Sequence, residues 1–323
     1  METMDMDAAL TGIAKRMMTA VAALALALCA CGCSLMTPTR AEVEQQPQTP
    51  LVDASALIQE GTLTVALDTT GAAPQGMVDQ EGRTTGYYAD VARALADNLG
   101  LHITFVDAAS ASASVGEGAA DIFIGASGSE ATDEITVFGS CLENAPALFA
   151  VEGSMPTPAL TALEGKTVAV QEGSAAQDAL NKAGSTAEQL VCSDVNECFE
   201  ALAAGRADCV ACDATAGSYL ARTYDNIAFA GTLDATTVTG VATLSSNSEL
   251  AQQVGAAFDS ISADGTLAAV HASWYGSLPL SLSDTLLSGV TIKADEDDEQ
   301  QDVADAPKAD DELDLSGINE FDG

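Results

Sequence analysis

The sequence predicts an α/β fold built as two lobes, each with a parallel or mixed sheet. From residue 61 onward, short segments with strand character alternate with amphipathic segments that have helical spacing. Such alternation is typical of parallel strands flanked by helices. The series is interrupted near residues 144–152 and again near 228–240, so we expect the chain to cross between the lobes twice, at two hinges.

The first series begins at residues 63–67, where apolar and polar side chains alternate as in a strand. Gly86 then opens a segment whose apolar residues recur every three or four positions, which gives one helix face, and Gly100 ends it. The two further strands expected in this series are residues 102–106 and 121–124.

The second series repeats the pattern. Strands are expected at residues 167–170, 190–192 and 208–212, and helices at 174–183, 195–204 and 214–221. Two more helices follow. The first has its apolar face along residues 250–261, and the second ends near residue 274. Ligands of such sheets bind at the carboxyl ends of strands. The loops after residues 67, 124, 170 and 212 are therefore the candidate binding loops.

The N-terminus has the features of a secretory signal. Lys15 and Arg16 precede an uncharged run, residues 17–30, that is too short to span a membrane comfortably. The run ends in a Cys-rich stretch that resembles a bacterial lipoprotein signal, with Cys31 the best lipidation site and Cys33 the second. We expect residues 1–30 to be the signal and 31–57 a polar tether; an uncleaved anchor or plain secretion is the alternative.

The net charge of −37 comes from 48 acidic and 11 basic residues. It argues against a nucleic-acid partner, because phosphate binding needs clustered Lys and Arg. Thirteen acidic residues and one base fall within 294–323, so we expect residues 277–323 to form a disordered acidic tail, solubilising or partner-binding. With two His in the chain, no metal site and no cofactor are expected.

Six segments in order carry a family resemblance: residues 61–68, 86–100, 118–125, 163–174, 204–213 and 263–276. Together they resemble the bacterial extracellular solute-binding proteins of family 3, the amino-acid receptors of ABC importers. The resemblance implies a periplasmic-binding-protein-like clamp, with lobe 1 at 58–145 plus 237–276 and lobe 2 at 146–236. It also implies a monomer, lipid-anchored outside the cell membrane, that binds a small polar solute and delivers it to an ABC permease.

The resemblance assigns roles to residues at the candidate loops. Asp213 would pair with a ligand ammonium, although an acid at this position is also a common helix N-cap. The family's carboxylate-binding Arg falls at Thr132, five residues after Ser127. Ser127 and the amides of three further residues could still hold an anion at helix starts. Those three residues are Gly125, Gly173 and Ser174.

The loop after the first strand also departs from the family. Asp68 and Gln75 lie in it, with Gln75 and Met77 near the family's aromatic positions, and Tyr88 stands where the family often has an acid. We therefore expect a small polar solute, amino-acid-like or cationic, and a cationic or polar neutral ligand suits these loops better than an ordinary α-amino acid. The alternative is a non-transport surface lipoprotein that has lost small-molecule binding.

The cysteines and histidines offer weaker enzyme alternatives. Cys192 and Cys198, at a strand end and an early helix position, are a plausible disulfide in an oxidising compartment. The Cys209–Cys212 spacing lies on a predicted strand, which favours a structural role over redox catalysis. Both His are expected to be packed side chains, so the sequence favours a non-enzymatic receptor over a redox or hydrolytic enzyme.

Overall fold

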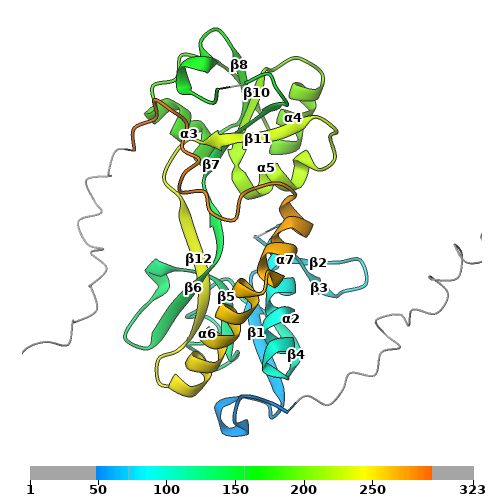
Figure 1. Cartoon of the computed structure of the whole chain (residues 1–323), viewed down its shortest axis with the longest axis vertical. Coiled ribbons are helices and arrows are strands. Elements are labelled where there is room, and N and C mark those ends of the chain that lie inside the picture. Colours follow the sequence, from blue (N-terminus) through cyan, green and yellow to red (C-terminus); the bar gives the residue numbers. More distant parts are fainter. Residues whose placement is uncertain (1–48, 72, 156, 293–323) are drawn as a thin grey trace, which may run out of the picture.

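The structure is a computed structural model that describes residues 49–71, 73–155 and 157–292. It contains two five-stranded mixed sheets, each in its own lobe, and the lobes follow one another along the long axis of the molecule (Figure 1). The predicted two-lobed α/β fold is confirmed. Within the described residues, no helix combines the length and apolarity needed to cross a membrane.

Lobe 1 is built on a sheet with strand order β4-β1-β5-β12-β6. Strands β4 and β5 pair in parallel with β1, whereas β12 runs antiparallel to both of its neighbours. The sheet comprises β1 (Thr62–Leu67), β4 (His102–Asp107), β5 (Ile122–Ser127), β6 (Ile135–Asn144) and β12 (Thr237–Leu244). A hairpin, β2 (Met77–Val78) and β3 (Thr84–Thr85), lies beside it.

Three helices pack together on lobe 1: α2 (Tyr87–Leu99), α6 (Ser248–Ala263) and α7 (Thr266–Tyr275). Helix α2 forms because its apolar residues recur every three or four positions and bury one face. It ends at Gly100, whose left-handed backbone (φ +70°) lets its amide bond to the Ala96 carbonyl.

Lobe 2 has strand order β11-β7-β10-β8-β9. Its strands are β7 (Pro146–Val151), β8 (Thr167–Gln171), β9 (Glu188–Cys192), β10 (Cys209–Asp213) and β11 (Ile227–Thr232). Its helices are α3 (Ala175–Lys182), α4 (Val195–Ala203) and α5 (Ala214–Ala221). Helices α3 and α4 begin at Ser174 and Asp194, whose side chains accept hydrogen bonds from the third residue of each helix.

The chain crosses between the sheets at two places. Strand β6 passes into β7 through Ala145, and β11 returns to β12 through residues 233–236. Buried side chains of both lobes form one continuous cluster, which includes Leu63 in lobe 1 and Phe149 in lobe 2. The crossovers therefore run through packed apolar surface.

After α7 the chain crosses to lobe 2 once more, as a segment that we call the C-terminal strap (residues 277–292; Figure 1, orange). Leu278, Leu282 and Leu287 of the strap are buried. The backbone of Thr232 bonds to Thr285 and Leu287. Disorder was expected from residue 277, and this is wrong for 277–292, because the leucines supply enough apolar surface to fix the strap on lobe 2.

The start of the described chain is also packed. Val52 and Leu57 are buried, and the Leu51 amide bonds to the Leu99 carbonyl at the end of α2. The end of the predicted tether thus belongs to lobe 1. The predicted signal peptide, the two candidate lipidation sites Cys31 and Cys33, and the acidic stretch 294–323 lie outside the described residues.

Candidate functional site

Two of the candidate binding loops, those after β1 and β10, meet where the two lobes adjoin. The Gln75 side chain, from the loop after β1, donates from Nε2 to Thr215 Oγ1 at 2.9 Å, in the first turn of α5. The Thr215 amide donates to Asn144 Oδ1 at 3.1 Å, at the end of β6. We call the loops after β1, β5, β8 and β10 the interlobe site, because this contact joins the first of them to the start of α5.

Asp213 ends β10 and precedes α5. Solvent reaches its side chain, yet the surrounding protein desolvates the carboxylate enough to raise its pKa. It does not cap α5, and it accepts no hydrogen bond and forms no ion pair within the described residues. Asp213 is therefore an acid held at the strand end, next to the hinge, with its binding capacity unused.

The predicted anion cradle after β5 is occupied by Glu130. Its Oε1 accepts from the Ser127 amide at 3.1 Å, and its Oε2 accepts from the Ala111 amide at 2.8 Å. The Ser127 hydroxyl is 2.7 Å from the Ser129 hydroxyl. The carboxylate of the chain itself thus sits on the amide that was expected to bind an anionic ligand.

The second predicted cradle, after β8, is also satisfied internally. The Gly173 amide donates to Gln177 Oε1 at 2.8 Å, and the Ser174 amide donates to the Gln171 carbonyl at 3.3 Å. The Ser174 hydroxyl accepts from the Gln177 amide and caps α3. The prediction that these amides bind an anion receives no support from this geometry.

Two other predicted ligand residues stabilise their own turns. Asp68 Oδ1 accepts from the Thr70 and Gly71 amides, both at 2.8 Å, and these bonds lower the pKa of Asp68. The Thr132 hydroxyl accepts from the amides of Glu134 and Ile135, so it closes the turn before β6. The structure does not bring either side chain to Asp213.

Tyr88 shapes the lobe 1 side of the interlobe site. Its hydroxyl pairs with Thr239 Oγ1 at 2.7 Å, and its amide donates to the Gln75 carbonyl at 2.9 Å. A Cβ on Gly125 would lie 2.7 Å from the Tyr88 ring, and Gly125 also has a left-handed backbone (φ +101°). The ring thus lies against the β5 backbone, and Gly125 is required for that approach.

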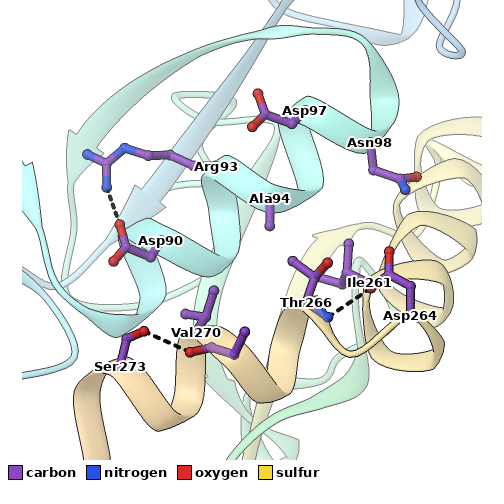
Figure 2. A pocket seen from close by; sticks show the side chains of 11 residues that line it. Asp90, Arg93, Ala94, Asp97, Asn98, Ile261, Asp264, Thr266, Val270 and Ser273 are labelled. Atoms are coloured by element: carbon purple, nitrogen blue, oxygen red, sulfur yellow. Dashed lines mark hydrogen bonds and ion pairs between the residues drawn. The ribbon is translucent and has the colours of Figure 1, made fainter. Parts of the chain in front are cut away.

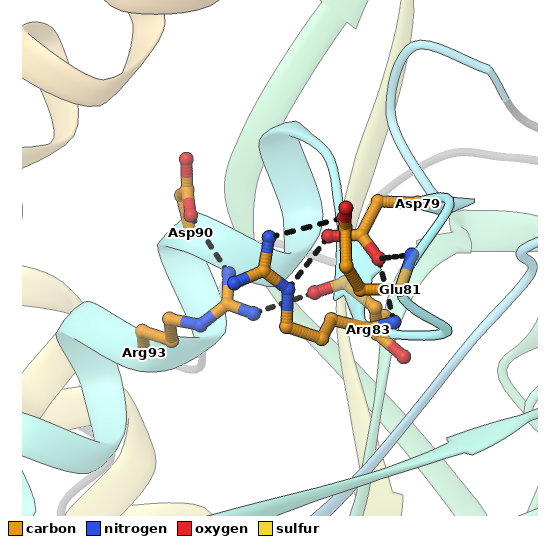
Figure 3. A network of polar contacts seen from close by, with 6 residues as sticks. Asp79, Glu81, Arg83, Asp90 and Arg93 are labelled. Atoms are coloured by element: carbon orange, nitrogen blue, oxygen red, sulfur yellow. Dashed lines mark hydrogen bonds and ion pairs between the residues drawn. The ribbon is translucent and has the colours of Figure 1, made fainter.

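The basic residues of the described chain lie away from this site. In Figure 3, Arg83 bonds to Asp79 and Glu81, and Arg93 bonds to Asp90 at 2.8 Å. Arg222 ends α5 and donates to the Ser273 and Trp274 carbonyls. The three remaining basic residues lie in lobe 2, where strands begin or a helix ends, whereas Asp213 lies where β10 ends. They are Lys166, Lys182 and Arg206.

A groove of about 580 Å³ lies elsewhere, between α2 and the α6–α7 pair on lobe 1 (Figure 2). Its acidic lining includes Asp90, but Asp90 already binds Arg93 and accepts from Trp274 Nε1 at 2.9 Å. Asp264, on the other wall, accepts from the Thr266 amide. These acids hold helices together, so the groove offers less free binding capacity than Asp213.

The predicted disulfide residues are unbonded and buried in the structure. Burial first, and then the neighbouring Cys192 thiol, raise the pKa of Cys198. Cys209 and Cys212 lie on β10, and burial raises the pKa of both. Raised pKa values disfavour the thiolate that redox catalysis needs.

Sequence reasoning missed three residues that determine this site: Glu130, Asn144 and Thr215. Glu130 had a signal, because a Ser followed by a Glu three positions later is a capping-box pattern. Asn144 and Thr215 had none, since their contact joins residues 71 positions apart across the hinge.

Two mixed sheets flanked by helices, two sheet-to-sheet crossovers and polar loops at strand ends define a two-lobed binding-protein fold. The chain belongs to the bacterial extracellular solute-binding proteins, family 3, whose model matches residues 63–277. No curated protein matched the sequence.

Solved structures share the fold. The chain is similar to a polar amino acid ABC uptake transporter substrate-binding protein from Streptococcus thermophilus, at 20% identity and TM-score 0.60, over 69% of this chain and 89% of that one. It is also similar to the unliganded, open L-cystine solute receptor of Neisseria gonorrhoeae, at 21% identity and TM-score 0.58, over 68% and 95%. At these identities the likeness establishes the fold alone.

Proposed function

We propose that this protein is the substrate-binding subunit of an ABC importer, which captures a small polar solute between its lobes and delivers it to a membrane permease. Family membership supports the role, and one observation carries it: Asp213 stands at the end of β10 with an unused, partly desolvated carboxylate. Lobe closure would then convert solute capture into a signal for the permease.

A ligand that binds the folded state raises the melting temperature by mass action. The test is therefore a thermal-shift screen of small polar solutes at millimolar concentration on the purified protein. Stabilisation by one chemical class, lost in Asp213→Asn, supports the proposal. If no solute stabilises the protein, the receptor role is wrong.

The alternative is a surface lipoprotein of the same fold without a small-molecule ligand. The hydrogen bonds of the Ser127 and Gly173 amides favour this alternative, because both amides already donate to side chains of the protein itself. Binding of the protein to its permease only in the presence of solute would exclude this alternative. Redox catalysis is not part of the proposal, because burial raises the pKa of the Cys209 and Cys212 thiols and so disfavours the reactive thiolate.

We also propose that Cys31 carries a lipid that anchors a monomeric protein to the outer face of the cell membrane. The support is the signal-like run before it and the extracellular nature of the family. Metabolic labelling with a fatty acid should mark the wild type and the Cys33→Ser variant but not Cys31→Ser. Labelling lost only in Cys33→Ser would move the anchor to that residue.

A further inference from the structure

We infer that the interlobe site selects organic amines that lack a carboxylate over the amino acids of the same side chain. This inference rests on the proposed function and names the ligand class of that site. Three observations carry it: the occupation of the amides after β5, the positions of the basic residues, and the unused acid at the end of β10.

The first observation is that the carboxylate of Glu130 occupies amides in and beside the loop after β5. Its two oxygens accept from the Ser127 and Ala111 amides, at 3.1 and 2.8 Å. A ligand carboxylate that bound these amides would have to displace Glu130 and would then lie beside a second negative charge. Two like charges a few ångströms apart in a partly desolvated site repel each other strongly.

The second observation is that no base is available to offset that repulsion. Each of the six basic residues in the described chain is either bound elsewhere or lies away from the ends of β5 and β10. Thr132, at the position of the family's Arg, uses its hydroxyl within its own turn. A carboxylate therefore loses the bidentate contact that a guanidinium would supply.

The third observation is that the Asp213 carboxylate is available to a cation. Asp213 has no partner among the described residues, and burial makes its charged form less favourable. An ammonium group beside Asp213 would offset that cost and form a charge-assisted hydrogen bond. The site thus favours a ligand group with a positive charge and disfavours one with a negative charge.

The test compares ligands that differ only by the carboxylate: agmatine with arginine, cadaverine with lysine, and histamine with histidine. Affinities would be measured by calorimetry on the purified full chain. At least one amine is expected to bind ten or more times tighter than its amino acid. An amino acid that binds as tightly as its amine, or more tightly, overturns the inference and leaves the receptor role intact.

Two variants test the residues. Asp213→Asn should weaken amine binding at least tenfold, whereas Asp225→Asn, an exposed acid before β11, should not. Glu130→Gln keeps an oxygen acceptor for the Ser127 amide but removes the charge. It should therefore lower the ratio of amine affinity to amino-acid affinity at least fivefold. An unchanged ratio in Glu130→Gln contradicts the inference.

The failure of this inference is separable from failure of the proposed function. If a neutral polar solute binds and no amine does, the inference is wrong and the receptor role stands. If neither amines, amino acids nor neutral solutes bind, the receptor role itself is wrong.

Discussion

Gln75 Nε2 donates a hydrogen bond to Thr215 Oγ1 at 2.9 Å and thereby joins the two lobes. The Thr215 hydroxyl in turn donates to Asn144 Oδ1 at 3.2 Å. Because Asn144 ends β6 at the first crossover, three parts of the molecule share this contact: the loop after β1, the hinge and the first turn of α5. A short chain of neutral hydrogen bonds therefore links the lobes at this point.

We expect Gln75→Ala and Thr215→Val to be coupled energetically. A neutral hydrogen bond contributes about 1 kcal/mol net, so the coupling energy in a double-mutant cycle should be about 1 kcal/mol. The measurement is the free energy of unfolding in denaturant for the wild type, both single variants and the double variant.

The control pairs Thr215→Val with Gln189→Ala. Gln189 lies on β9, and its side-chain amide donates to Asn181 Oδ1 at 2.9 Å within lobe 2. Because this contact shares no partner with Thr215, the two effects should be additive. Equal coupling in both cycles would mean that the Gln75–Thr215 contact does not join the lobes in solution.

His271 is expected to make the protein less stable in mild acid. It is 3% exposed, packed between the rings of Tyr87 and Tyr275, and burial lowers its pKa from 6.5 to about 4. Below pH 6.5 the unfolded chain binds a proton that the folded chain excludes. Stability is therefore fully present above pH 6.5 and falls toward pH 4, by up to about 3 kcal/mol.

Denaturant unfolding between pH 4 and 7 would measure this loss. His271→Leu should remove that share of the pH dependence, because no imidazole is left to charge in the unfolded chain. His102→Gln, at an exposed site on β4, should keep the wild-type slope. A His271→Leu protein with the full wild-type slope would assign the pH dependence to other groups.

The elements of this fold were predictable where one physical signal dominated. Helix α2 followed from apolar spacing and from Gly86 and Gly100 at its ends, and β1 followed from alternation. The C-terminal strap was not predicted, because its three buried leucines, Leu278, Leu282 and Leu287, lie four and five positions apart and two less buried leucines lie between them, so neither the helix period nor the strand period marks the buried set. Their burial depends on the surface of lobe 2, which the local sequence does not encode.

The interlobe site was predictable only in part. Asp213 was found because the family resemblance assigns an ammonium-pairing acid to the loop after the strand expected at residues 208–212. That Glu130 turns back onto the Ser127 amide was missed, although the capping pattern was present, because an anion cradle and a capped turn use the same amides. Which group fills such amides is decided by the fold.

Cys192 and Cys198 are expected to form a disulfide once the protein is exposed to an oxidant. Their thiols are neighbours in the reduced structure. Closing so short a loop should stabilise the protein by about 2 kcal/mol. Peptide mapping by mass spectrometry without reduction should find a linked 192–198 pair, and reduction should lower the melting temperature.

The Cys198→Ser variant is the matched control, because it should melt at the same temperature with and without reductant. Free Cys192 and Cys198 in protein secreted under oxidising conditions would contradict the prediction. Cys141 is expected to stay reduced, because it is buried in lobe 1 and burial raises its pKa to about 12.

The C-terminal strap is expected to stabilise the molecule as a core element does. Leu282 and Leu287 are 1% and 2% exposed, and they pack into clusters that contain Phe149 and Leu163 of lobe 2. Replacing either leucine by Ala should lower the free energy of unfolding by about 2–4 kcal/mol. Leu280→Ala is the matched control, because Leu280 is 45% exposed, and it should cost less than about 0.5 kcal/mol.

Glu143 ties the strap to the hinge, because its Oε2 accepts from the Leu282 amide at 2.6 Å and from the Ser281 hydroxyl at 3.2 Å. Glu143→Ala should therefore expose the strap to protease before either sheet unfolds, which limited proteolysis with mapping of the first cleavage would detect. A first cut elsewhere, or equal stability losses for Leu280, Leu282 and Leu287, would mean that the strap does not hold lobe 2 in solution.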